Sequence, residues 1–97
     1  MAAGDRKARE TQRRLEFGHA ILEYRRMMML SQTELAQQIG IKRNTLSQWE
    51  RAGAFPQPYH MRALMNAEKL APDFKEDLKA IYESVPWMAS TGGRVFI

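Results

Sequence analysis

Residues 30–50 read LSQTELAQQIGIKRNTLSQWE, and this stretch decides the fold. Ser31 is a favourable residue for capping the start of a helix, and Glu34 follows three positions later, so the two have the spacing of a capping box. The segment Gln32–Gln38 contains strong helix formers and neither glycine nor proline. Gly40 follows it, and glycine adopts the left-handed conformation in which many helices end. The pattern therefore predicts a short helix over 32–38 followed by a tight turn.

A second short helix is expected over residues 43–52, with Gly53 closing it. Leu46 and Trp49 form its apolar side. The faces away from Leu46 carry the polar or basic side chains of Lys42, Arg43, Asn44, Ser47, Gln48 and Arg51. Arginine pairs with guanine edges in the major groove of DNA, and asparagine and glutamine pair with adenine edges. Because two helices this short are unstable alone, they must pack against a third element.

Segments of this stretch and residues that precede it together match the pattern of a known family. The matching segments are 30–32, 34–36, 39–41 and 45–50, together with Phe17-Gly18, Ile21 and Tyr24-Arg25. They resemble the helix-turn-helix signature of the phage repressor/Cro (XRE-type) family, over roughly residues 15–70. The resemblance implies an all-α, five-helix repressor-like bundle. It also implies a sequence-specific double-stranded DNA-binding transcriptional regulator, and more specifically a repressor, that reads the major groove with the helix 43–52.

The resemblance also assigns roles to residues. Arg43, Asn44 and Gln48 match the family's base-reading positions, and Gln32 matches a phosphate contact at the start of the first short helix. The candidates for contacts with the DNA backbone or flanking positions are Lys42, Thr45, Ser47 and Arg51. For Ser47 and Arg51 an ordinary solvated helix face is an equally good explanation.

Arg25 and Glu50 are expected to form a structural ion pair. The family pairs residues at these two places, and a charge held near the core is tolerated only when it is paired.

Outside this motif the sequence predicts three further helices and two irregular ends. The helices are expected over residues 11–28, 58–70, and from 71 to just before Pro86. Gly18 in the first of them predicts a close approach to another helix. Phe55 either plugs the core or is an exposed anchor for a partner.

The expected organisation is a flexible basic arm over residues 1–10 that becomes helical from about Asp5, the helix-turn-helix domain over 11–84 and an irregular tail over 85–97. The arm and the following turn carry Arg6, Lys7, Arg9, Arg13 and Arg14, which either follow DNA or only aid solubility. The tail either packs back through Trp87 or adds residues 94–97 as a strand to a partner. The last helix and the tail together are the expected surface of a homodimer.

Charge and composition favour a nucleic-acid partner. The 97 residues carry a net charge of +4, and all of this excess lies in residues 1–58. The chain has no cysteine, no apolar run long enough to span a membrane and no signal-peptide pattern at its start, so a cytoplasmic, nucleoid-associated protein is expected.

No arrangement of residues predicts catalysis, a metal site or a cofactor. His19 and His60 lie on different predicted helices, and neither has other ligand residues at a suitable spacing. Two alternatives to a simple regulator are an antitoxin that represses its own operon and binds a toxin protein through the tail, and a protein-interaction module that uses the fold only as a scaffold. The polar set on the helix 43–52 argues against the second alternative.

Overall fold

Five helices make up the part of the chain that the structure describes. The computed structural model describes the backbone of residues 2–84 and the side chains of residues 8–84. The helices are α1 (Ala2–Met27), α2 (Gln32–Ile39), α3 (Arg43–Glu50), α4 (Pro58–Asn66) and α5 (Pro72–Glu83). Residues 2–84 contain no strand, so the predicted all-α, five-helix bundle is confirmed.

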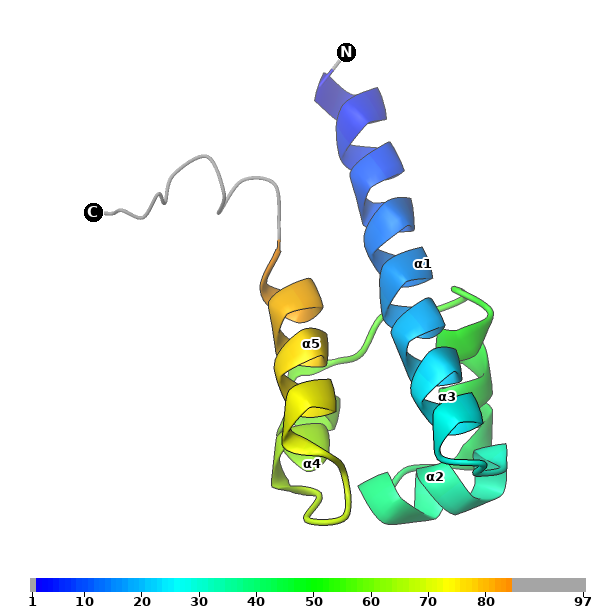
Figure 1. The fold of residues 1–97 in the computed structure, drawn as a ribbon. Helices are drawn as coiled ribbons and strands as arrows, with labels where there is room; N and C mark the ends of the chain where they lie inside the picture. The colour runs from blue at the N-terminus through cyan, green and yellow to red at the C-terminus, as the bar shows by residue number, and fades with distance from the viewer. Residues whose placement is uncertain (1, 85–97) are drawn as a thin grey trace, which may run out of the picture.

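The long helix α1 packs against both α3 and α5. Helix α3 packs against one side of α1 and α5 against another, while α2 and α4 complete the end of the bundle (Figure 1). The core contains Phe17, Ile21 and Tyr24 from α1, and Leu46 and Trp49 from α3. The rings of Phe17 and Trp49 meet edge to face, with their centroids 5.4 Å apart. The core therefore fixes α3 directly to α1.

Helix α1 begins earlier than its sequence pattern predicts. The main helix was expected from residue 11, after a flexible arm that becomes helical from about Asp5, whereas α1 starts at Ala2. Residues 2–10 lack proline and contain mostly alanine, arginine, lysine and glutamate, which all favour helix. Residues 2–10 have no apolar side chain larger than alanine, so no amphipathic pattern marks where the helix starts.

The end of α1 is formed without glycine. Met29 adopts a left-handed conformation with φ 56°, and its side chain is 89% exposed. The N–H of Leu30 donates to the carbonyl of Arg25 at 2.9 Å, and that of Met29 donates to Arg26 at 3.1 Å. This pair of bonds is the Schellman pattern, which usually has glycine in the left-handed position.

Helix α3 ends in the same way, and the sequence prediction was wrong by one residue about which position closes it. The left-handed residue is Ala52, with φ 59°, and Gly53 has an ordinary φ. The N–H groups of Ala52 and Gly53 donate to Trp49 and Gln48, at 3.0 and 2.8 Å. The helix therefore ends at Glu50 rather than at Ala52.

Helix α4 is also shorter than predicted. It ends at Asn66 instead of residue 70, although Leu70 is only 2% exposed and still belongs to the core. The apolar spacing that suggested a longer helix therefore reflects burial of Leu70 from the turn that follows α4.

Gly18 allows α1 and α3 to approach closely, as its position in an amphipathic helix predicted. A Cβ atom at this position would lie 3.2 Å from the carbonyl carbon of Trp49 and 3.3 Å from the Cα of Glu50. The carbonyl oxygen of Trp49 would be nearer still, well inside van der Waals contact. No larger residue fits here without moving the end of α3.

Phe55 packs into the bundle and is not an exposed anchor. Its ring lies 5.5 Å from that of Phe17 and, in a parallel stack, 5.5 Å from that of Tyr82. The guanidinium of Arg13 lies 4.3 Å above the Phe55 ring and donates to the Tyr82 carbonyl at 2.8 Å. Partial burial lowers the pKa of Arg13 below its usual value. Arg13, which was a candidate for contacts with the DNA backbone, is therefore engaged in contacts within the protein that join α1 to the end of α5.

The expectations for the tail, including Trp87 and the strand over 94–97, concern residues outside the part of the chain that the structure describes.

Candidate nucleic-acid interface

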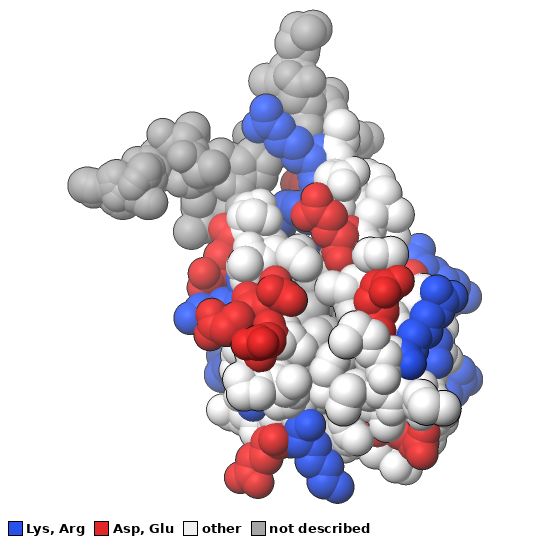
Figure 2. Space-filling model, viewed as in Figure 1, with Lys and Arg blue, Asp and Glu red and all other residues white. Residues whose placement is uncertain are grey.

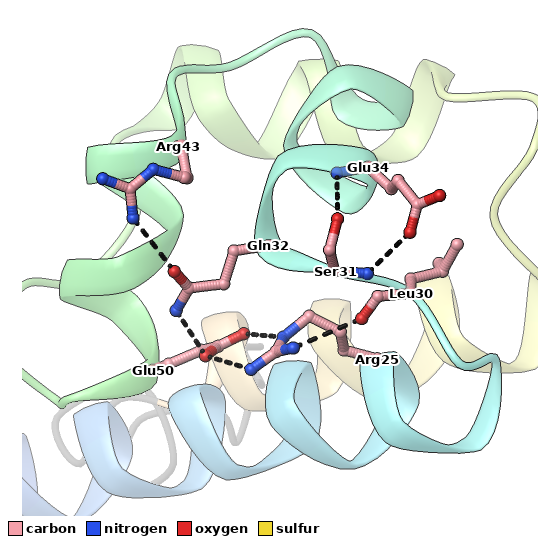
Figure 3. Close-up of polar contacts among 7 residues, drawn as sticks. All are labelled: Arg25, Leu30, Ser31, Gln32, Glu34, Arg43 and Glu50. Atoms are coloured by element: carbon pink, nitrogen blue, oxygen red, sulfur yellow. Dashed lines mark hydrogen bonds and ion pairs between the residues drawn. The ribbon is translucent and has the colours of Figure 1, made fainter.

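The geometry of the α2–turn–α3 segment follows from its capping residues. The hydroxyl of Ser31 accepts the Glu34 N–H at 3.0 Å, and the Glu34 carboxylate accepts the Ser31 N–H at 2.8 Å (Figure 3). Gly40 ends α2 with φ 89°, and its N–H donates to the Ala36 carbonyl at 2.8 Å. The capping box and the left-handed glycine thus fix where α2 starts and where the chain turns toward α3.

Helix α3 presents a polar face to solvent. Leu46 and Trp49 are at most 1% exposed and point inward. The exposed residues of this segment are Lys42, Arg43, Asn44, Gln48 and Arg51, whereas Thr45 and Ser47 are half-buried. The three base-reading candidates thus lie on the solvent side, two at the start of the helix and Gln48 one turn later. Arg51 follows the end of the helix, away from that group.

Arg25 and Glu50 are brought together beneath this face. The Nε and Nη2 atoms of Arg25 donate to the two carboxylate oxygens of Glu50 at 2.7 and 3.0 Å. The side chain of Glu50 is 7% exposed and that of Arg25 is 22% exposed. The hydrogen bond from Arg25 to Glu50 raises the pKa of Arg25 further above its usual value. Glu50 is the only acid between positions 42 and 51, so its pairing leaves the positive charges of Lys42, Arg43 and Arg51 unopposed within the segment.

A chain of hydrogen bonds connects this ion pair to the start of α3. Glu50 also accepts the Nε2–H of Gln32 at 2.9 Å, and the amide oxygen of Gln32 accepts an Arg43 N–H at 3.2 Å (Figure 3). Arg43 makes a longer contact, 3.4 Å, with Oδ1 of Asn44. This bridge was not predicted from the sequence. The signal available in the sequence was that Gln32 and Arg43 are each the first residue of a short helix. The two helix starts lie at the same end of the motif.

His60 positions the start of α4 against α3. Its Nδ1 accepts the N–H of Gln57 at 3.2 Å, and its ring meets that of Trp49 edge to face at 5.3 Å. Burial lowers the pKa of His60 below its usual 6.5, which favours the neutral ring that this bond requires. His60 therefore has a structural role, as does the capping pair at Ser31.

Two searches of the described residues bear on other classes of site. No group of three or more His, Cys, Asp or Glu side chains that could hold a metal ion is found there. Among the described helices, none combines the length and the apolar character needed to cross a membrane.

Comparisons with known proteins agree with the geometry. Residues 21–67, which include the end of α1 and the whole of α2, α3 and α4, match the helix-turn-helix family model. No curated protein and no solved structure gives a significant match. This family consists of DNA-binding regulators and is not typically enzymatic. The chain therefore carries, over residues 21–67, a helix-turn-helix domain of the Cro/C1 (XRE) type, the DNA-binding domain of a transcription regulator.

Proposed function

We propose that the protein is a repressor that recognises a specific double-stranded DNA sequence by laying α3 in the major groove. The observation that carries this proposal is the exposure of Arg43, Asn44 and Gln48 on α3. Arginine, asparagine and glutamine side chains all make paired hydrogen bonds to base edges. The start of the helix, where two of them lie, is the part that enters the groove in this class of domain.

The proposal gives the hydrogen-bonded bridge a positioning role. In the free protein Gln32 holds Arg43, and Gln32 is itself held by Glu50. Contacts of this kind reduce the number of side-chain conformations that binding must restrict, which lowers the entropic cost of complex formation. On DNA the exposed contacts of Arg43 exchange for contacts to a base, while the bond between Gln32 and Glu50 keeps the two helix starts aligned.

Backbone contacts supply the part of the affinity that does not depend on sequence. Lys42 and Arg51 lie exposed at either end of α3, and Gln32 lies at the start of α2, where helix N–H groups attract phosphate. Thr45 and Ser47 are half-buried and are proposed as shorter-range contacts to the sugar–phosphate backbone. Because cations on phosphate release counterions, binding should weaken steeply as salt rises.

A single domain of this kind reads only a few base pairs, so we propose that two copies bind together. A two-fold dimer would place its half-sites about 34–36 Å apart, one turn of the duplex.

The test is selection of bound duplexes from a random double-stranded DNA pool, followed by affinity measurements on the enriched sequence. The variant Arg43→Ala with Asn44→Ala should lose at least about 30-fold in affinity, since each paired base contact contributes roughly 1–3 kcal/mol. Lys79→Ala is a control, because it also removes one positive charge but lies on α5. It should change affinity by less than about threefold. A pool that yields no enriched sequence, or a double variant that binds as well as the control, contradicts the proposal.

A further inference from the structure

A second surface, separate from α2 and α3, has features that DNA binding does not use. A hollow of about 340 Å³ lies between α1 and α5. Its floor is the stacked pair Tyr24 and Phe74, whose ring centroids are 3.8 Å apart and whose planes differ by 6°. The N–H of Ala71 donates to the Tyr24 hydroxyl at 3.2 Å, which ties the start of α5 to α1. The floor is therefore rigid and apolar.

Exposed methionines border this hollow. Met27 and Met28 line it, and they are 77% and 51% exposed. Apolar side chains grouped on a surface commonly mark an interaction site. Methionine is suited to such a role, because its unbranched and polarisable side chain adapts to different partners. The hollow therefore has a fixed floor and an adaptable rim.

Every charged residue that lines the hollow is acidic. These residues are Glu23 on α1, and Asp73 and Asp77 on α5. Figure 2 shows uncharged side chains over α1 and α5 with acidic side chains on both sides of them. The two lysines of α5, at positions 75 and 79, each lie two residues beyond one of the aspartates, which is about 200° around the helix. An acidic hollow on a chain of net charge +4 is unsuited to DNA and complementary to a cation.

The charges also argue against a second copy of this chain as the occupant. In a closed two-fold dimer the same patch faces itself. Such a contact would bring Glu23, Asp73 and Asp77 of one copy against the same three acids of the other, and like charges across an interface are unfavourable. A different protein with basic side chains does not have this conflict.

We propose that the hollow between α1 and α5 is a docking site for a segment of another protein in which an apolar side chain is flanked by lysine or arginine. The apolar side chain enters over Tyr24 and Phe74, and the flanking cations pair with the three acids. Because α3 packs on another side of α1, the site stays open when α3 is occupied (Figure 1). Docking and DNA binding are therefore separate functions of one small domain.

The test uses the full chain with methyl-labelled methionine and two synthetic helical peptides that share one leucine pattern, one flanked by lysines and the other by glutamates. The lysine peptide should shift the methyl resonances of Met27 and Met28, assigned with the Met27→Leu and Met28→Leu variants. The glutamate peptide should not shift them. Equal binding of the two peptides, or shifts confined to other methionines, would overturn the proposal.

Two pairs of substitutions separate a specific site from general attraction to acids. Asp73→Asn with Asp77→Asn should weaken binding of the lysine peptide about tenfold. The control is Glu76→Gln with Glu83→Gln, which removes the same charge from α5 at positions that do not line the hollow, and it should change binding less than twofold. Equal losses in the two variants would show that no site exists.

Self-association is measured in parallel by analytical ultracentrifugation. If the chain dimerises and Met27→Gln returns it to a monomer, a second copy occupies the hollow and the proposal is wrong. A bound DNA duplex should leave the affinity for the lysine peptide unchanged within about twofold, which tests the docking site independently of what α3 recognises.

Discussion

Replacing Gly18 with alanine should destabilise the protein although alanine is the better helix former. Alanine in the middle of a helix gains about 1 kcal/mol over glycine. The added methyl, however, would meet the carbonyl group of Trp49 and the Cα of Glu50, the latter at 3.3 Å. Overpacking costs typically about 1–3 kcal/mol, and the upper end applies here because the obstacle is backbone rather than a flexible side chain. The expected net loss is about 2 kcal/mol.

The same chain provides two matched controls. Gly53 has an ordinary φ, and a Cβ there would lie 3.5 Å from its nearest neighbour, so Gly53→Ala should change stability by less than about 0.5 kcal/mol. Gly40 has open space around it but φ 89°, so Gly40→Ala should lose about 1–2 kcal/mol through backbone conformation alone. The three variants therefore separate steric overlap from backbone strain.

The assay is urea unfolding followed by circular dichroism, with thermal unfolding as a check. A loss of about 2 kcal/mol in a domain of this size lowers the melting temperature by roughly 8–16 °C. Gly18→Ala should also weaken DNA binding, because the overlap moves the end of α3 and with it Glu50. If Gly18→Ala is as stable as the parent protein, the close approach of the two helices is not what fixes α3, and the reasoning fails.

Three further predictions concern polar and strained positions. Glu50→Gln should lower the free energy of unfolding in urea by about 2 kcal/mol, because it leaves the charge of Arg25 unpaired. This value lies between the small contribution of an exposed pair and the roughly 3–5 kcal/mol lost when a buried pair is broken. A loss below about 0.5 kcal/mol would contradict a semi-buried pair. Met29→Gly should gain about 0.5 kcal/mol, since it relieves a left-handed conformation at a side chain that is 89% exposed, and an unchanged melting temperature would show that no strain is present. Burial holds the folded-state pKa of His60 below 6.5, so the unfolded chain binds the proton first and the free energy of unfolding should fall as the pH drops below 6.5. The fall should be smaller in His60→Gln, and equal slopes between pH 7 and 5.5 in the two proteins would exclude burial of His60 as its source.

The sequence predicted the α2–turn–α3 segment well because its signals are local. Ser31 with Glu34 marks the start of α2, and Gly40 marks its end, and each acts within a few residues of itself. The predicted role of Gly18 was also correct, since a glycine inside an amphipathic helix has few explanations other than a close approach.

The features that the sequence did not predict depend on contacts distant in the chain, on competition between neighbours or on helix propensity alone. The bond from Arg13 to the Tyr82 carbonyl spans 69 positions, so no local pattern reports it. The end of α3 depends on whether Ala52 or Gly53 takes the left-handed conformation, and in the structure Ala52 takes it although glycine is intrinsically better suited. The start of α1 is set by helix propensity without an apolar pattern, which is a weak signal in a single sequence.

In the proposed mode of DNA recognition, the bridge from Glu50 through Gln32 to Arg43 limits how freely the exposed face of α3 can be redesigned. A different residue at position 43 leaves the Gln32 amide oxygen without the partner it has in this structure. Gln32 must then bond to the new side chain, to water or to the DNA. Engineering of new target sequences should therefore vary positions 32 and 43 together, and libraries that randomise only the exposed face of α3 should recover fewer functional domains.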